Sequence, residues 1–169
     1  YYALPGRMLV QALSNTSNKG GVTGMALYNN QGKHLASYAM PTDGGGDGYG
    51  YDLAVNPKKN VLLTSSFTGY ANYMRPLGDL IKDDEAMKKF GNTMVLWDLK
   101  AIKPTKVLAV PGTPLEIRWS LNPKDNWAIT AAALTSKLWL VKQDGKGEWI
   151  AKEVGTIGDP SKIPLPVDI

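Results

Sequence analysis

The stretch VNPKKNVLLTSS (residues 55–66) decides the fold, because a second stretch, LNPKDNWAITAA (121–132), repeats its pattern. Both contain Asn-Pro-Lys-x-Asn followed at once by a short apolar run. An Asn-Pro pair favours a turn, because proline fixes its own φ and cannot donate a backbone hydrogen bond. The apolar run that follows is typical of a buried strand. Each copy therefore predicts a turn that leads into a strand.

The residues around each copy extend the repeat to four strands. One strand precedes each Asn-Pro turn, and two more apolar runs follow it, such as MVLWDL (94–99) and KVLAV (106–110) after the first copy. LPGRMLVQALS (4–14) is a weaker third copy, with Pro5 in the place of Pro57. Four antiparallel strands per repeat of roughly 40–60 residues are the signature of a β-propeller blade. We therefore predict an all-β chain of about three four-stranded antiparallel blades that belong to a larger β-propeller.

The repeat also predicts where the blades begin and end. The expected blade units are residues 1–42, 48–111 and 112–158, and residues 163–169 should start the innermost strand of a next blade. The first unit should lack its innermost strand, which we expect before Tyr1. Three blades cannot close a ring, since propellers take typically 4–8 blades. We therefore interpret 1–169 as an internal segment of a single propeller domain, whose main partner is the remainder of the same propeller.

One stretch departs from the β pattern. PLGDLIKDDEAMKKF (76–90) has Leu80, Ile81 and Met87 near helical spacing, with acidic residues early and lysines late, which suits the helix dipole. We predict one short amphipathic helix there, inserted into the second blade, with these three side chains facing protein. The stretch DGGGDGYG (43–50) lacks the spacing of a calcium loop, so we expect a flexible loop that leads into an inner strand.

Composition excludes several classes of function. The 169 residues are 43% hydrophobic and 20% charged, which suits one globular domain with a core. The net charge is +4, but the lysines are scattered and no basic run interleaves with aromatic residues, so we expect no nucleic-acid partner. No apolar run approaches the roughly 18 residues of a membrane helix, so we expect no membrane partner. The chain has no cysteine, which excludes disulfides and a cysteine nucleophile within it.

Five motifs follow one another in a specific order along the chain. They are Gly50-Tyr51-Asp52 ahead of a strand, the strand from Asn60 to Ser65, the helical insertion, Val95-Leu96-Trp97-Asp98, and Pro114-Leu115-Glu116-Ile117-Arg118. In this order they resemble the selenium-binding protein family, and within it the bacterial methanethiol oxidases. The resemblance covers nearly the whole chain.

The resemblance carries expectations about function. It implies a propeller with a funnel-shaped central channel and a copper-dependent oxidation of methanethiol to formaldehyde, hydrogen sulfide and hydrogen peroxide. It further implies copper as the cofactor, a small thiol and oxygen as partners, a periplasmic location, and a possible homo-oligomer. The histidine-rich segments of the family fall outside this chain, so we expect no metal ligand within it. His34, the one histidine, is expected to be a surface hairpin residue.

Candidate site residues come from the strands that should line the channel. The expected innermost strands carry Asp52, Glu116 and Asp168. Asp52 and Arg118 each lie five residues before the proline of their repeat, so they should occupy equivalent places, and Glu116 lies two residues before Arg118 on the same face. We predict Asp52, Glu116 and Arg118 as channel-lining catalytic candidates. Asp168 is the candidate for a residue that helps to bind the cofactor indirectly, by orienting the side chains that hold the copper ion.

Two roles for these charged residues stay open at this point. They could orient histidine ligands or accept the proton of the substrate thiol. Alternatively, they could hydrogen-bond neighbouring blades and hold the ring closed. Two alternatives to the enzyme also remain: a propeller that binds thiol or selenium without catalysis, and a protein-interaction scaffold that docks partners on residues 76–90.

Overall fold

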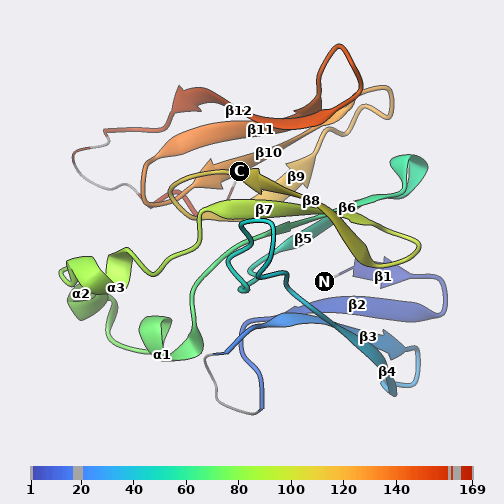
Figure 1. The fold of residues 1–169 in the computed structure, drawn as a ribbon, viewed down its shortest axis with the longest axis horizontal. Helices are drawn as coiled ribbons and strands as arrows, with labels where there is room; N and C mark the ends of the chain where they lie inside the picture. The colour runs from blue at the N-terminus through green and yellow to red at the C-terminus, as the bar shows by residue number, and fades with distance from the viewer. Residues whose placement is uncertain (1, 17–20, 160, 162–164, 169) are drawn as a thin grey trace.

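The computed structural model describes residues 2–16, 21–159, 161 and 165–168. These residues form three four-stranded antiparallel sheets, each with its strands in chain order (Figure 1). The first sheet contains β1 (Tyr2–Leu4), β2 (Arg7–Ala12), β3 (Gly24–Asn29) and β4 (His34–Ala39). The second contains β5 (Leu53–Asn56), β6 (Val61–Ser65), β7 (Thr93–Asp98) and β8 (Lys103–Ala109). The third contains β9 (Pro114–Trp119), β10 (Trp127–Ala132), β11 (Lys137–Gln143) and β12 (Trp149–Thr156).

This arrangement confirms the prediction of an all-β chain built from three propeller-type blades. The first strands β1, β5 and β9 lie at the inner edge of their sheets and contact one another in series. One expectation was wrong, because the first sheet has its innermost strand. Tyr2–Leu4 pairs with β2, and the Pro5-Gly6 turn between them uses a left-handed glycine, Gly6 at φ 74°. A strand of three residues is too short for its apolar pattern to stand out in the sequence.

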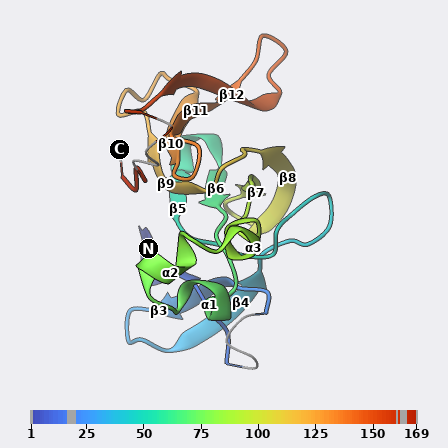
Figure 2. The same ribbon diagram turned by 90° about the vertical axis from the view of Figure 1, so that its left-hand side faces the viewer.

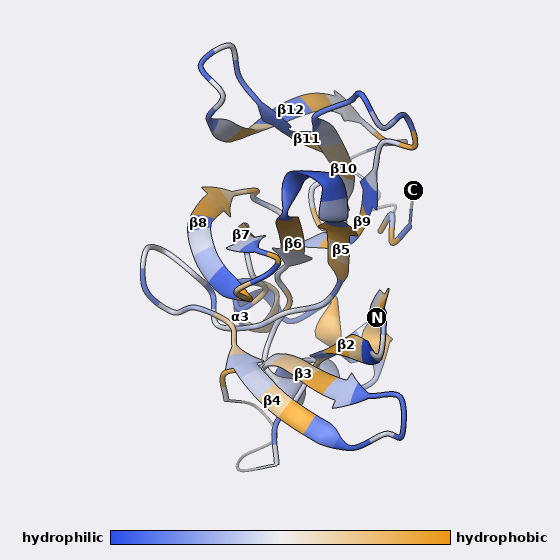
Figure 3. Cartoon of the chain, turned by 90° about the vertical axis from the view of Figure 1, so that its right-hand side faces the viewer, coloured by the Kyte–Doolittle hydropathy of each residue, from blue (hydrophilic) through white to orange (hydrophobic). Residues whose placement is uncertain are grey.

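Both Asn-Pro pairs lie in the turn between the first and second strands of their sheets, as predicted. Asn56 ends β5 and caps the 3₁₀ turn Pro57–Lys59 that follows. Its side chain accepts a hydrogen bond from the N–H of Lys59, the last residue of that turn. Asn60 then takes a left-handed φ of 56°, which asparagine tolerates better than most residues. Figure 3 shows the apolar character of β5 and the hydrophilic turns that bound the strands.

The middle strands β6 and β7 of the second sheet are buried on both faces, and their side chains alternate between the two. Leu62 faces the first sheet in a core with Leu9 and Trp97. Leu63 faces the third sheet in a core with Leu96, together with Ile117 of β9. Leu62 and Leu63 are both fully buried.

The insertion between β6 and β7 is helical, but it is not the single helix that we predicted. It forms three short turns, α1 (Tyr70–Tyr73), α2 (Leu77–Leu80) and α3 (Asp84–Met87), which gather at one end of the sheets (Figure 2). Asp83 interrupts the helix because its side chain caps α3 by accepting from Ala86 N–H, and it also pairs with Arg75. Leu80 is buried and Met87 half-buried as expected, whereas Ile81 is 40% exposed.

The loop over residues 43–50 is joined to distant segments by hydrogen bonds. Asp47 accepts hydrogen bonds from Asn92 N–H and from the Thr93 hydroxyl, and Gly50 N–H donates to Thr23 Oγ1. The sequence did not predict these contacts, because the donors are remote from the loop along the chain.

The expected strand over residues 163–169 is not seen in its described part. Residues 165–168 have no strand assignment, while 163, 164 and 169 lie outside the described residues. Asp168 in this segment instead pairs with Arg118 of β9. No helix among the described residues is long and apolar enough to cross a membrane.

Candidate functional site

The candidate residues meet where the first strands of the second and third sheets lie side by side. Asp52 immediately precedes β5, and Glu116 and Arg118 lie two residues apart in β9. Asp52 Oδ2 accepts a hydrogen bond of 2.9 Å from Ile117 N–H, which joins the two strands directly. Asp52 Oδ2 also lies 3.6 Å from Arg118 Nη1, so these two side chains lie close together as predicted.

Arg118 brings all four candidates together. Its Nη1 donates to Glu116 Oε2 at 3.0 Å and to the Ile117 carbonyl at 3.0 Å, and its Nη2 donates to Asp168 Oδ1 at 2.6 Å. Asp168 thus reaches the inner strands although its segment is not a strand. We call the group of Tyr51, Asp52, Glu116, Arg118 and Asp168 the Arg118 cluster.

The cluster holds three carboxylates and one guanidinium in a partly exposed setting. The side chains of Asp52 and Glu116 are 18% and 26% exposed, against 45% for Arg118 and 68% for Asp168. Three acidic groups surround one cation. The protonated, neutral form of at least one acid is therefore more favourable in this cluster than it would be in water.

The pKa values follow this imbalance. Burial raises the pKa of Glu116, and the Asp52 carboxylate raises it further, while the hydrogen bond from Arg118 opposes them. Burial also raises the pKa of the Tyr51 hydroxyl, with further contributions from Glu116, Asp52 and Asp168. Burial lowers the pKa of Arg118, but the carboxylates outweigh this effect and leave it above its ordinary value. A carboxylate with a raised pKa is a stronger base, so Glu116 can accept a proton from a weak acid such as a thiol.

Two further residues of this site were not among the sequence candidates. Ser65 Oγ donates to the Leu115 carbonyl at 2.5 Å and accepts from Asp52 N–H at 3.1 Å, so it fixes Asp52 against β9. Tyr51 adds a hydroxyl beside the carboxylates. Both residues lie in motifs that the sequence singled out, Asn60 to Ser65 and Gly50-Tyr51-Asp52, but their roles depend on neighbours in the third sheet.

The described histidine and carboxylate side chains do not fit a copper site. Among them, no three histidine, cysteine, aspartate or glutamate side chains come together in a way that could hold a metal ion. In the Arg118 cluster the guanidinium already occupies the centre of the carboxylates, where a cation would repel it. His34 lies exposed on β4 as expected, with its Nε2 2.9 Å from Ser37 Oγ. Copper favours histidine, cysteine and methionine ligands, so the Arg118 cluster has the wrong donors as well.

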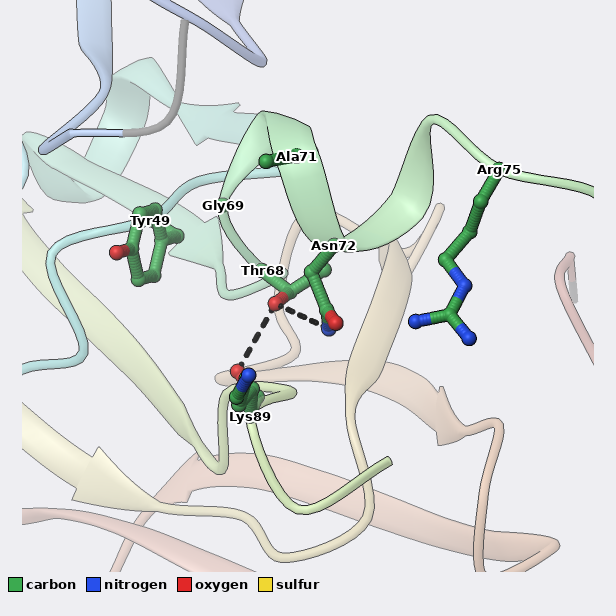
Figure 4. A pocket seen from close by; sticks show the side chains of 7 residues that line it. All are labelled: Tyr49, Thr68, Gly69, Ala71, Asn72, Arg75 and Lys89. Carbon is green, nitrogen blue, oxygen red and sulfur yellow. Dashed lines mark hydrogen bonds between the residues drawn. The ribbon is translucent and has the colours of Figure 1, made fainter. Parts of the chain in front are cut away.

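Two of the cavities that the insertion lines differ in the character of their walls. The first has a volume of about 480 Å³ and a mixed wall, whose polar side chains include Thr68, Asn72, Arg75 and Lys89 (Figure 4). Its polar groups mostly bond one another: Thr68 Oγ1 donates to the Lys89 carbonyl, Asn72 donates to Thr68, and Arg75 pairs with Asp83. This pattern holds the insertion together.

The second cavity has a volume of about 330 Å³ and lies between the insertion and the third sheet. We call it the insertion pocket. Its wall is almost entirely apolar and includes Phe67, Leu80, Phe90, Thr113, Leu115 and Val167. It borders the Arg118 cluster through Phe67, whose ring lies 5.0 Å from that of Tyr51.

Comparison with known proteins extends the resemblance seen in the sequence. The family described as 56kDa selenium binding protein matches residues 2–164. A methanethiol oxidase of Hyphomicrobium sp is 70% identical over all 169 residues, and one of Ruegeria pomeroyi is 50% identical over an alignment of 180 residues that covers the whole chain. The chain spans only 39% and 41% of these two relatives.

A solved structure shares the fold. The X-ray structure of a hypothetical selenium-binding protein from Sulfolobus tokodaii superposes with a TM-score of 0.75 at 22% identity. The similarity covers 90% of this chain and 34% of that one. At this identity the likeness speaks for the fold alone.

Proposed function

Because the chain belongs to the selenium-binding protein family, we propose that the protein that carries it is a copper-dependent methanethiol oxidase. The observation that carries the proposal is the 70% identity, over the whole chain, to a protein of that name. In the proposed reaction, methanethiol, oxygen and water give formaldehyde, hydrogen sulfide and hydrogen peroxide, one molecule of each. The carbon loses two electrons and oxygen gains two, so the reaction balances without another oxidant.

The part of this chain would be to bind the thiol and take up its proton. Glu116 is the proposed proton acceptor, since it lies beside Arg118 on the inner strand β9 and its pKa is raised by burial. The positive charge of Arg118 would then stabilise the remaining carboxylates of the cluster while Glu116 takes up the proton. Asp52 and Ser65 would keep β9, and with it Glu116, at a fixed distance from β5.

Copper would be held by other parts of the protein, because the described histidine and carboxylate side chains do not fit it. When bound, it would supply the electron transfer to oxygen. No step at the Arg118 cluster requires direct contact with the metal. The periplasm is the proposed location, and the absence of cysteine suits an oxidising compartment.

The proposal is tested with the purified protein that carries this chain. Copper content is measured first, and methanethiol is then added in air while formaldehyde, hydrogen sulfide and peroxide are quantified. We expect the three products in equal amounts, and we expect their formation to stop when a chelator removes the copper and to return when copper is restored. Thiol binding without peroxide release would identify a binding protein, and neither binding nor release would favour a protein-interaction scaffold.

A further inference from the structure

The insertion pocket contains one polar side chain without a partner. Thr113 lines the pocket and is 2% exposed, and its hydroxyl has no hydrogen-bond partner among the described residues. A buried hydroxyl without a partner is unfavourable, so such a group in a native protein calls for an explanation.

The backbone at Thr113 is unusual as well. Its φ is 65°, in the left-handed region, which is a rare conformation for a β-branched residue. The conformation is held from outside, because the Thr113 carbonyl accepts a hydrogen bond of 3.0 Å from Ala133 N–H. Strained backbone that the surroundings enforce clusters at ligand sites. The strain and the unpartnered hydroxyl are independent observations on one residue.

The rest of the pocket suits an alkyl group. The rings of Phe67 and Phe90 lie 5.4 Å apart in an edge-to-face arrangement, and Leu80 and Met87 pack with them. Ile81, 40% exposed, lies at the border of the pocket with solvent. A volume of about 330 Å³ is at the small end of the range for ligand sites, roughly 300–1,000 Å³.

From these observations we infer that the insertion pocket binds a small alkyl thiol, with the alkyl group among the aromatic rings and the sulfur beside the Thr113 hydroxyl. This inference rests on the proposed function for the identity of the thiol. The pocket borders the Arg118 cluster through Phe67, whose ring packs against that of Tyr51. The volume exceeds what methanethiol needs, so longer alkyl thiols should also fit.

The test measures binding rather than turnover. Copper-free protein is mixed with methanethiol, ethanethiol or propanethiol without oxygen, and the dissociation constant is obtained from saturation-transfer NMR on the thiol methyl signal. We expect each added methylene to tighten binding by about 4-fold, as burial of a CH₂ group predicts.

Two variants locate the site, and a third serves as the control. Thr113→Val keeps the shape and removes the hydroxyl, so thiol binding should weaken about 2- to 10-fold while the melting temperature stays the same or rises. Ile81→Trp should fill the mouth and weaken binding more than about 10-fold. Leu121→Trp introduces the same large side chain at a fully exposed turn position and should change nothing.

The outcomes separate the two proposals. Thiol binding that both pocket variants weaken, in a protein without oxidase activity, would support the pocket and overturn the oxidase. Normal oxidase activity with unchanged dissociation constants in Thr113→Val and Ile81→Trp would overturn the pocket and leave the oxidase standing. A loss of binding in Leu121→Trp as large as that in Ile81→Trp would also overturn the pocket.

Discussion

The second sheet joins its two neighbours by hydrogen bonds of different chemistry, in addition to the apolar packing on its two faces. At the junction with the first sheet, Thr23 Oγ1 accepts a neutral hydrogen bond of 2.8 Å from Gly50 N–H. At the junction with the third sheet, Asp52 accepts from Ile117 N–H within a cluster that also contains Arg118. A neutral bond is enough to tie two sheets together. The charges at the second junction therefore exceed what assembly needs, which favours a chemical role for them.

The largest expected effect tests whether the two apolar junctions are equivalent. Leu62→Ala and Leu63→Ala remove fully buried side chains that face the first and third sheets, respectively. Each should lower the free energy of unfolding by about 2–5 kcal/mol, because each leaves a cavity in a packed core. Denaturant midpoints measure the loss, with Leu121→Ala as the exposed control. A loss in only one variant would show that one junction depends little on apolar packing.

Loss of the neutral hydrogen bond between Gly50 and Thr23 should have the next largest effect on the free energy of unfolding. Thr23 is buried, and Thr23→Val keeps its shape but leaves Gly50 N–H without its acceptor. The free energy of unfolding should fall by about 1–3 kcal/mol, the cost of an unsatisfied buried donor. The loss should be the same at low and high salt, since no charge is involved. A strong salt dependence would mean that this junction is not neutral.

Removal of the cation should have a smaller and salt-dependent effect. Arg118→Met keeps much of the side-chain bulk and leaves Asp52, Glu116 and Asp168 facing one another. Because Arg118 is nearly half exposed, water screens the repulsion, and the expected loss is only about 0.5–2 kcal/mol. Raising the salt concentration to about 1 M should shrink the difference from the wild type. If salt leaves the difference unchanged, Arg118 acts by packing instead of charge.

The smallest effect on stability concerns the protonation of Glu116. Its pKa lies above the ordinary 4.5, chiefly through burial, so the folded protein holds this proton to a higher pH than the unfolded chain does. Glu116 therefore contributes stability below pH 4.5 that is lost as the pH rises through its folded pKa. Glu116→Gln lacks this loss, so its melting temperature should gain on the wild type as the pH rises from 4.5 through the folded pKa of Glu116. A change in the opposite direction would mean that the ionised carboxylate is stabilised in the fold.

Much of the fold could be predicted from the sequence because it depends on local chemistry. The Asn-Pro turns at Asn56 and Asn122 fix where the second strand of each blade begins, and alternation along the strands fixes which side chains are buried. Asp52 and Arg118 each lie five residues before the proline of their repeat, and this spacing led to the correct prediction that the two side chains lie close together.

What the sequence could not show depends on contacts between distant segments. Asp83 splits the insertion because it finds both Ala86 N–H and Arg75, and Asp47 fastens its loop through Asn92. Ser65 and Thr113 look like ordinary polar residues in the sequence. Their importance appears only when β9 lies beside β5 and when the insertion closes over the third sheet.

The most direct test of the central claim, that the Arg118 cluster serves chemistry, is the turnover of Glu116→Gln in the copper-loaded protein. Peroxide release on addition of methanethiol and the melting temperature are measured on the same sample at neutral pH. We predict that turnover per copper falls by about 100-fold or more, as expected for the loss of a proton acceptor, while the melting temperature is unchanged or higher. Near-normal turnover per copper would contradict the claim and would leave Glu116 as a structural tie between two sheets.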